Sequence, residues 1–169
     1  MVPELLTDRL RLRPWRLDDF EPLAAFLGDS ELAQYRAPVA DRFEAWKHMC
    51  GQSGQWSIRG YGIFAVALRD TDQPIGYSGL YHPIIFDEPE LSWSLFAGHH
   101  GQGYATEMAT AVCRWAANDL MRPPLMSIVH PDNIASIRVA ERLGAKPEGE
   151  TVYLDAPRIV YRHRDWRAS

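Results

Sequence analysis

The spacing of hydrophobic residues predicts strands and helices in a mixed order along the chain. Short apolar runs, typical of strands, occur at residues 9–13, 63–68, 75–81, 91–96, 125–129, 152–154 and 159–163. Apolar residues three and four positions apart, typical of helices, occur at residues 20–27, 42–50, 104–120 and 134–143. Three consecutive strands with short links predict an antiparallel meander, followed by a helix that crosses to a parallel strand. We therefore predict one domain, residues 1–169, with a mixed α+β sheet.

Capping residues and glycines refine these elements. Asp18 or Asp19 is expected to cap the helix at its start, and Gly28 is expected to end it. Gly76 and Gly79 fall inside a predicted strand. A glycine in that position indicates a bulge or the close approach of another backbone.

The region from residue 30 to residue 60 is predicted to be helical and loop-like. Ser30 is expected to cap a short helix that leads to Tyr35. A second helix is predicted from Arg42 to Cys50, and residues 51–60 are predicted to form a mobile connection because they are rich in glycine.

Composition and charge narrow the class of protein. The 169 residues are 46% hydrophobic and 24% charged, which is typical of a globular domain. The formal charge of −4 and the absence of a Lys/Arg run argue against nucleic-acid binding, and the acidic balance slightly favours a cationic substrate. The start of the chain resembles no signal peptide and no stretch is long enough to span a membrane, so we expect a cytoplasmic protein. Cys50 and Cys113 have no metal or redox spacing, so no metal is expected and Cys113 is predicted to be a core residue.

The most informative segment is residues 90–107, where a strand, a glycine-rich turn and a helix follow one another. Gly98, Gly101 and Gly103 form the turn. Glycines allow several N–H groups to converge on one anion, and the first amides of a helix lack intrahelical partners. A phosphate group is the usual ligand of this arrangement, with an ordinary turn as the alternative. The residues after Gly103 exclude a P-loop and fit a dinucleotide fingerprint poorly.

Three segments together resemble one known family. His-Gly-Gln-Gly-Tyr-Ala at 100–105 resembles the pyrophosphate loop of the GNAT superfamily of acyl-CoA-dependent N-acyltransferases, although His100 stands where Arg or Gln is usual. Asn-x-x-Ser-x-x-Val-x-x-x-Leu-Gly at 133–144 resembles the last motif block of that family. Residues 7–14 resemble the opening of the ribosomal-protein-alanine acetyltransferase branch. The resemblance covers residues 5–166.

This resemblance implies a GNAT-like fold, with a mostly antiparallel twisted sheet, flanking helices and a splayed strand at the acyl-CoA site. It implies transfer of an acetyl group from acetyl-CoA to a primary amine. The pyrophosphate of coenzyme A is expected on His100, Gly101, Gln102, Gly103, Tyr104, Ala105 and Thr106. The pantetheine is expected to pair with Trp93, Ser94 and Leu95, where a backbone N–H would polarise the thioester carbonyl.

The acceptor must lose a proton, because an ammonium has no lone pair with which to attack. Lys-like amines have a pKa of ~10.4 and α-amines one of ~8, so the former need a base more. The resemblance implies that Glu90 is this base, acting through a water, with a solvated strand-end carboxylate as the alternative. His82 and His130 are second choices.

The departing thiolate needs a proton in return. Many related enzymes use a tyrosine at the position that Ala140 occupies here, so Ser136 is expected to replace it. Asn133 is expected to hold a water or the pantetheine amide. The alternative is that Asn133 only caps its helix and Ser136 only faces it.

The acceptor side of the site is expected in the region after the first helix. Tyr35 and Arg36 are expected to bind the substrate, whereas core packing is the preferred interpretation for Phe43 and Trp46. The acceptor is predicted to be a protein N-terminus or a small amine, and a homodimer is one oligomeric option. The alternative function is a non-catalytic acyl-CoA-binding sensor or assembly module, which would need neither a base nor a proton donor.

Overall fold

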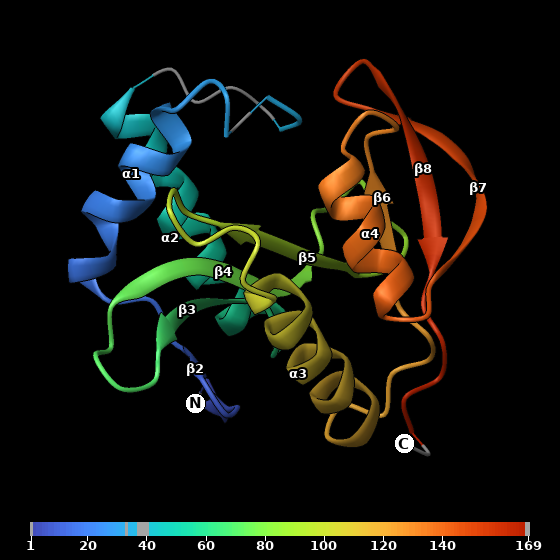
Figure 1. Ribbon diagram of the computed structural model, residues 1–169, viewed down its shortest axis with the longest axis horizontal. Coiled ribbons are helices and arrows are strands. Elements are labelled where there is room, and N and C mark those ends of the chain that lie inside the picture. Colours follow the sequence, from blue (N-terminus) through green and yellow to red (C-terminus); the bar gives the residue numbers. More distant parts are fainter. Residues whose placement is uncertain (1, 33, 37–40, 168–169) are drawn as a thin grey trace.

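The computed structural model describes residues 2–32, 34–36 and 41–167 and shows one eight-stranded sheet flanked by helices (Figure 1). The strands are β1 (Leu5–Leu6), β2 (Leu10–Arg13), β3 (Ile63–Leu68), β4 (Pro74–Tyr81), β5 (Glu90–Leu95), β6 (Met126–Val129), β7 (Lys146–Tyr153) and β8 (Ala156–Arg162). The helices are η1 (Leu17–Asp19, a 3₁₀-helix), α1 (Phe20–Gly28), α2 (Arg42–Arg59), α3 (Tyr104–Asn118) and α4 (Ile134–Arg142). The sheet order is β1-β2-β3-β4-β5-β6-β8-β7. The mixed, mostly antiparallel α+β fold predicted from the sequence is confirmed.

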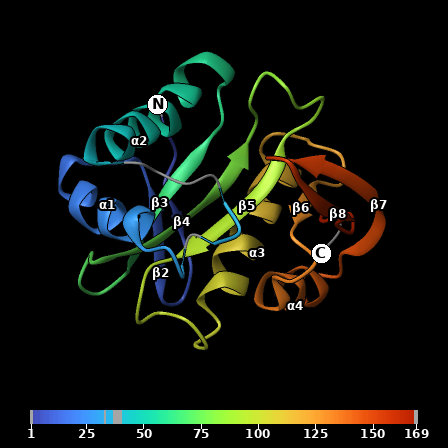
Figure 2. The ribbon, with the colours of Figure 1, turned by 90° about the horizontal axis from the view of Figure 1, so that it is seen from above.

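Helices cover both faces of this sheet, as the view from above shows (Figure 2). On one face α3 packs against β4 and β5, and its Met108 and Val112 are fully buried. On the other face Phe26 of α1 and Met49 of α2 pack around Tyr77 of β4. Both faces of the central strands are therefore packed against helices, which fixes the positions of the residues at the ends of β4 and β5.

The sheet opens between β5 and β6. These strands run parallel and share one registered pair, Glu90 with Met126, although β5 continues to Leu95 and β6 to Val129. The predicted splayed strand is therefore β5. Gly76 of β4 lies so close to β5 that an added Cβ would be 2.2 Å from the Ser94 carbonyl oxygen, which confirms the expected close backbone approach.

The long helix α2 corrects the prediction of a mobile connection at residues 51–60. The helix begins after Asp41, whose carboxylate accepts hydrogen bonds from the N–H groups of the first turn, and continues through both internal glycines to Arg59. Gln52 and Trp56 are buried and extend the stripe that begins at Ala45 and Met49. Burial of this stripe outweighs the weak helix propensity of glycine.

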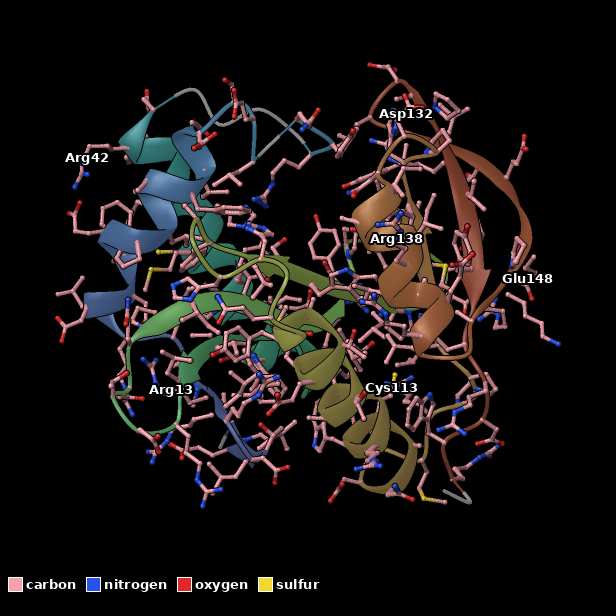
Figure 3. The ribbon with its side chains drawn as sticks, viewed as in Figure 1. Arg13, Arg42, Cys113, Asp132, Arg138 and Glu148 are labelled. Carbon is pink, nitrogen blue, oxygen red and sulfur yellow. The ribbon has the colours of Figure 1, made fainter. Side chains whose placement is uncertain are left out.

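Asp19 occupies the N-cap position of α1, as expected, but its side chain makes no capping hydrogen bond to that helix. Its carboxylate is buried and forms a two-pronged ion pair with the buried Arg13, at 2.8 and 2.9 Å. It also accepts the Arg16 N–H in the turn before α1. The side chain therefore fixes β2 to the start of the helical layer, as the position of Arg13 beside β2 and β3 in Figure 3 indicates.

Two further boundaries differ from the predictions. The short helix expected from Ser30 is absent from the described residues there, which form turns after the Asp29 carboxylate accepts the N–H groups of Glu31 and Leu32. The C-terminal hairpin is longer than predicted and turns at Leu154 and Asp155, both with positive φ. The edge strand β7 is exposed and polar, so its hydrophobic pattern does not reveal it.

The side chains of three residues test the predicted core. Cys113 of α3 is 1% exposed, so its assignment to the core is confirmed. The core assignment of Phe43 and Trp46 is wrong, since 66% and 40% of their surfaces are exposed on α2.

No helix within the described ranges is long and apolar enough to cross a membrane, and no cluster of three potential metal ligands occurs among the described residues.

Candidate active site

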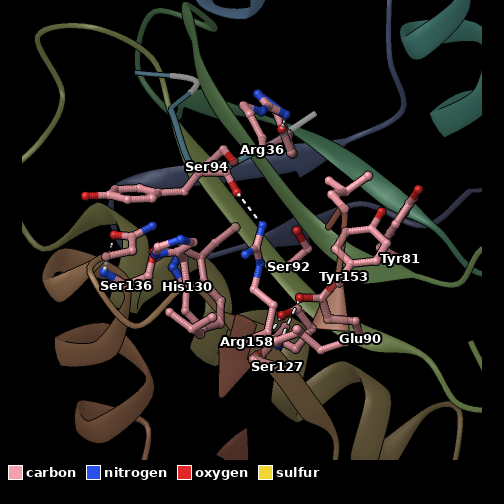
Figure 4. A pocket seen from close by; sticks show the side chains of 18 of the residues that line it. Arg36, Tyr81, Glu90, Ser92, Ser94, Ser127, His130, Ser136, Tyr153 and Arg158 are labelled. Atoms are coloured by element: carbon pink, nitrogen blue, oxygen red, sulfur yellow. Dashed lines mark hydrogen bonds between the residues drawn. The ribbon is translucent and has the colours of Figure 1, made fainter. Parts of the chain in front are cut away.

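A cavity of ≈ 290 Å³ lies where β5 and β6 separate (Figure 4). Its floor is formed by β4, β5 and β6, and its walls by α1, α2, α4 and the β7–β8 hairpin. The structure brings several predicted site residues to this cavity: Tyr35, Arg36, Glu90, Trp93, Ser94, His130, Asn133 and Ser136. Residues that are far apart in the sequence therefore meet at the point where the pairing of β5 with β6 ends.

Side chains replace backbone pairing at this interruption. The Glu90 carboxylate accepts the Ile128 N–H at 3.0 Å, and the Ser127 hydroxyl donates to the Leu91 carbonyl at 2.7 Å. The buried His163 ring then lies 2.9 Å from the Ser127 oxygen and must donate its Nε2–H, because the Ser127 proton is already used. These bonds satisfy backbone groups that would otherwise be buried and unpaired, so the two strands can separate at little cost.

The environment of Glu90 favours its neutral form. Burial raises the pKa of Glu90 to about 7, and the Ile128 N–H and the positive charge of Arg158 offset part of this effect. A carboxyl group with a pKa near neutrality can both accept and release a proton under ordinary conditions. This is the property that a general base requires.

Asn133 and Ser136 stand together at the start of α4. The Asn133 side chain is the helix cap, because its Oδ1 accepts the Ser136 N–H at 3.1 Å. This bond uses the oxygen of the carboxamide and leaves its NH₂ group and the Ser136 hydroxyl as the polar groups that line the cavity. The capping alternative is thus present in the structure, and it does not exclude a second role.

The glycine-rich turn lies beyond the far end of β5. Gly98, Gly101 and Gly103 all have positive φ, between 76° and 82°, and Gly103 immediately precedes α3. The turn is exposed, so the first amides of α3 are accessible to a ligand. Arg9 connects the turn to α3, because its side chain donates to the Gln102 carbonyl at 3.0 Å and forms an ion pair with Glu107 of α3 at 2.6 Å.

Other predicted residues lie outside the cavity. His100, Gly101, Gln102, Gly103, Tyr104, Ala105 and Thr106 belong to the turn and the start of α3, at the surface or partly buried. Leu95 is 7% exposed and contributes to the core. His82 lies elsewhere and has both ring nitrogens engaged, with the Tyr61 hydroxyl at 2.5 Å and the Phe86 carbonyl at 3.0 Å. His130 lines the cavity, but its Nδ1 accepts the Asp132 N–H.

Several residues of the cavity escape prediction from the sequence. Arg158 of β8 is 5% exposed, and His48 of α2 has a pKa lowered to about 4 by burial and by the charge of Arg36. Tyr81 and Tyr153 lie near Glu90, and burial raises the pKa of Tyr153, as does its neighbour Tyr81. Arg158 falls just before the strand predicted at residues 159–163, so no signal in the sequence indicated it, and nothing in the pattern distinguishes the others from core residues.

Comparisons with known proteins show the family and the fold. The sequence pattern of the acetyltransferase (GNAT) domain family matches residues 9–146. A solved acetyltransferase from Agrobacterium tumefaciens is 36% identical, with a TM-score of 0.87, and the match covers 97% of this chain and 95% of that one. The N-acetyltransferase p20 of Bacillus licheniformis, which is uncharacterized, is 27% identical over 86% of this chain and 83% of its own length. RimL, the ribosomal L7/L12 alpha-N-protein acetyltransferase solved with coenzyme A, is 20% identical, with a TM-score of 0.80 and coverage of 99% and 100%.

Proposed function

Because this chain belongs to the acetyltransferase (GNAT) family, we propose that it moves an acetyl group from acetyl-CoA to a primary amine at the cavity between β5 and β6. Family membership makes the chain an acetyl-CoA-dependent N-acetyltransferase and argues against a non-catalytic binding module. The observation that carries the proposed site is Glu90, a half-buried carboxyl with a pKa near 7 at the point where the strands separate.

The residues present suit acetyl-CoA. The exposed amides at the start of α3, preceded by three glycines with positive φ, would hold the pyrophosphate. The β5–β6 pairing has one registered pair, at Glu90, so the backbone groups of Trp93, Ser94 and Leu95 that face away from β4 are available to the pantetheine arm. A backbone N–H there would stabilise the negative charge that develops on the thioester oxygen during the reaction.

Glu90 and Ser136 are the proposed proton acceptor and donor. The Glu90 carboxylate would remove a proton from the acceptor ammonium, directly or through a water, so that the free amine attacks the thioester carbonyl. The Ser136 hydroxyl would give a proton to the departing thiolate, and the NH₂ group of Asn133 would orient the pantetheine amide or a water. Ala140, at the position where many related enzymes have a tyrosine, is fully buried and offers no alternative donor.

The acceptor class is a primary amine, either a protein N-terminus or a small molecule. RimL, an alpha-N-protein acetyltransferase, has the same fold, which supports the first option, while the cavity volume of ≈ 290 Å³ supports the second. Tyr35 and Arg36 are the proposed acceptor contacts. The cytoplasmic location and the homodimer suggested by the sequence stay predictions, which cell fractionation and size-exclusion chromatography would test.

The test is the release of free thiol from acetyl-CoA in the presence of pooled amines, with mass spectrometry of the acetylated product. Glu90→Gln keeps an acceptor for the Ile128 N–H but cannot take up a proton, so its turnover should fall by roughly 10²- to 10⁴-fold. The control is Glu150→Gln on the exposed strand β7, which should behave as wild type. Wild-type turnover in folded Glu90→Gln would remove Glu90 from the mechanism.

A further inference from the structure

The acceptor end of the cavity is cationic, although the protein as a whole is acidic. Of the described residues that line the cavity, Arg36 and Arg158 carry guanidinium groups and Glu90 alone carries a carboxyl group. The sequence led us to expect a slight preference for a cationic substrate from the net charge of −4, but the local charge at the site has the opposite sign.

Arg158 and Arg13 are both buried, but their partners differ. Arg13 is 2% exposed and pairs with Asp19 through two hydrogen bonds. Arg158 is 5% exposed, yet its side-chain hydrogen bonds go to the carbonyl oxygens of Pro157 and Tyr35. The charge of Glu90 interacts with Arg158, but among the described residues no carboxylate accepts a hydrogen bond from this buried guanidinium. A ligand that supplies a hydrogen-bonded negative charge would therefore be favoured here.

Arg36 has an unused donor. Its Nη2 donates to the Tyr77 hydroxyl, and its guanidinium faces the Phe26 ring at 4.6 Å. Its Nη1 is buried and makes no hydrogen bond within the described part of the chain. Arg36 is thus held in place by aromatic contacts, with one donor left for a ligand. A planar guanidinium in this state suits a carboxylate, which accepts hydrogen bonds in a matching geometry.

The segment that carries Arg36 also limits the size of the acceptor. The Tyr35 carbonyl accepts from Arg158 at 3.4 Å and the Tyr35 hydroxyl donates to the Asp132 carbonyl at 3.1 Å. These two bonds tie residues 34–36 to β8 and to the loop before α4, across the cavity. In Figure 4 the Arg158 side chain extends from β8 toward this segment. An extended peptide would have to break this connection, whereas a free amino acid would not.

We propose that the acceptor is a free amino acid, whose α-carboxylate lies between Arg36 and Arg158 and whose α-amine faces Glu90. The side chain of this amino acid would contact Phe26, Leu32 and Leu154, which favours an apolar or aromatic residue. This inference rests on the proposed function, because it names the acceptor of the same site. No further reagent is needed: the ammonium gives one proton to Glu90, the free amine nitrogen forms a bond to the acetyl carbon, and the carbon–sulfur bond breaks. Ser136 gives a proton to the departing thiolate, and the second proton that the nitrogen loses on forming the amide restores the Ser136 hydroxyl, directly or through a water.

The experiment compares the twenty protein amino acids with their carboxamides as acceptors, with the polycation tobramycin as a further probe. Amidation lowers the pKa of the neighbouring ammonium and so supplies more free amine, which means that a preference for the acid cannot come from amine reactivity. Wild type should prefer an apolar amino acid over its amide by roughly 10- to 100-fold in kcat/KM. Arg36→Gln and Arg158→Gln should each reduce this ratio toward one.

The acid-to-amide ratio separates recognition from support of the fold, since a variant that only loosens the cavity would slow both acceptors alike. The matched control is Arg114→Gln on the exposed face of α3, which should keep the wild-type ratio. Efficient acetylation of amides or tobramycin, with a ratio near one in wild type, would overturn the amino-acid proposal and leave the proposed function intact.

A binding measurement keeps the two proposals distinguishable if no turnover is found. Calorimetry of the CoA-saturated protein with L-phenylalanine, L-leucine and L-methionine, and with their amides, needs no chemistry. Binding of an acid over its amide, lost in Arg158→Gln, would support the acceptor inference even if acetyl transfer failed. Equal binding of acids and amides, or no binding of either, would overturn it.

Discussion

The Glu90 carboxylate accepts the Ile128 backbone N–H at 3.0 Å, across the point where β5 and β6 separate. One side chain therefore does two things, because the group that replaces a bond of the sheet is also the proposed base. Its partial burial at this point raises its pKa to about 7, so the opening of the sheet and the basicity of the site have a common origin.

The stability of the protein should depend on pH through Glu90. Its pKa rises from an ordinary 4.5 to about 7 on folding, so between these values the folded state binds more protons than the unfolded state. The free energy of unfolding contributed by this group is thus highest below the ordinary pKa and falls as pH rises through about 7. Thermal melts from about pH 4 to about pH 8 should show wild type losing stability relative to Glu90→Gln as pH rises. If the difference in Tm between wild type and Glu90→Gln were the same at every pH, the raised pKa of Glu90 would be contradicted.

Loss of the Ser136 hydroxyl should slow turnover without weakening coenzyme A binding. Ser136→Ala keeps the cap, because Asn133 bonds to the Ser136 backbone, and alanine is the better helix former. We expect kcat to fall roughly tenfold, with a larger defect at high pH, because a thiolate left unprotonated can re-attack the intermediate before the amide is formed. Steady-state kinetics check this, with Ser57→Ala on the exposed face of α2 as the control. Wild-type kcat at every pH would leave solvent or substrate as the proton source.

Substitutions of Asn133 should separate its two roles. Asn133→Ala removes the helix cap and should lower the free energy of unfolding by ~1 kcal/mol, in addition to slowing turnover. Asn133→Asp keeps a capping oxygen but loses the NH₂ group, so it should regain the stability and not the activity. Chemical denaturation and kinetics of both variants provide the measurements. Full activity in Asn133→Asp would reduce the residue to a cap.

Gly103→Val should abolish or strongly weaken coenzyme A binding. The φ of 82° at Gly103 is strained for a branched residue by ~1–3 kcal/mol, and a Cβ there would meet Arg9 at only an ordinary 3.5 Å. The backbone conformation, rather than steric overlap within the protein, therefore makes glycine necessary. Calorimetry with coenzyme A should show at least a roughly tenfold loss of affinity. Gly54→Val, inside α2 with open space around it, is the control, and an unchanged Kd in folded Gly103→Val would refute the assignment of the turn.

His100→Arg should tighten coenzyme A binding. Arginine is always charged and offers a two-pronged donor, whereas a neutral imidazole offers one donor. His100 is exposed, so the gain should be a few-fold, about 0.5–1 kcal/mol, and should shrink as salt is added. His99→Arg, one residue earlier in the same turn, tests whether added charge alone suffices. Weaker binding of His100→Arg would indicate that the histidine has a specific role.

The sequence by itself determined the order of the central elements and the two motif segments. The glycines before α3 and the capped helix α4 are local features, since φ preferences and helix caps depend on neighbouring residues. The β3–β4–β5 meander followed from strand patterns with short links. The GNAT resemblance, which the family match confirms, rested on these same local patterns.

The tertiary structure alone decided which helix residues surround the site and which charged side chains lie in it. Residues 51–59 belong to α2 because Gln52 and Trp56 are buried, and the Asp19 side chain makes no capping bond to α1 because it pairs with the buried Arg13. Arg158 lies in the cavity because β8 pairs with β6, a strand distant in the sequence whose residues also line the site. Such choices depend on burial and on charges contributed by distant segments, and the free energies involved exceed the local preferences that a sequence pattern records.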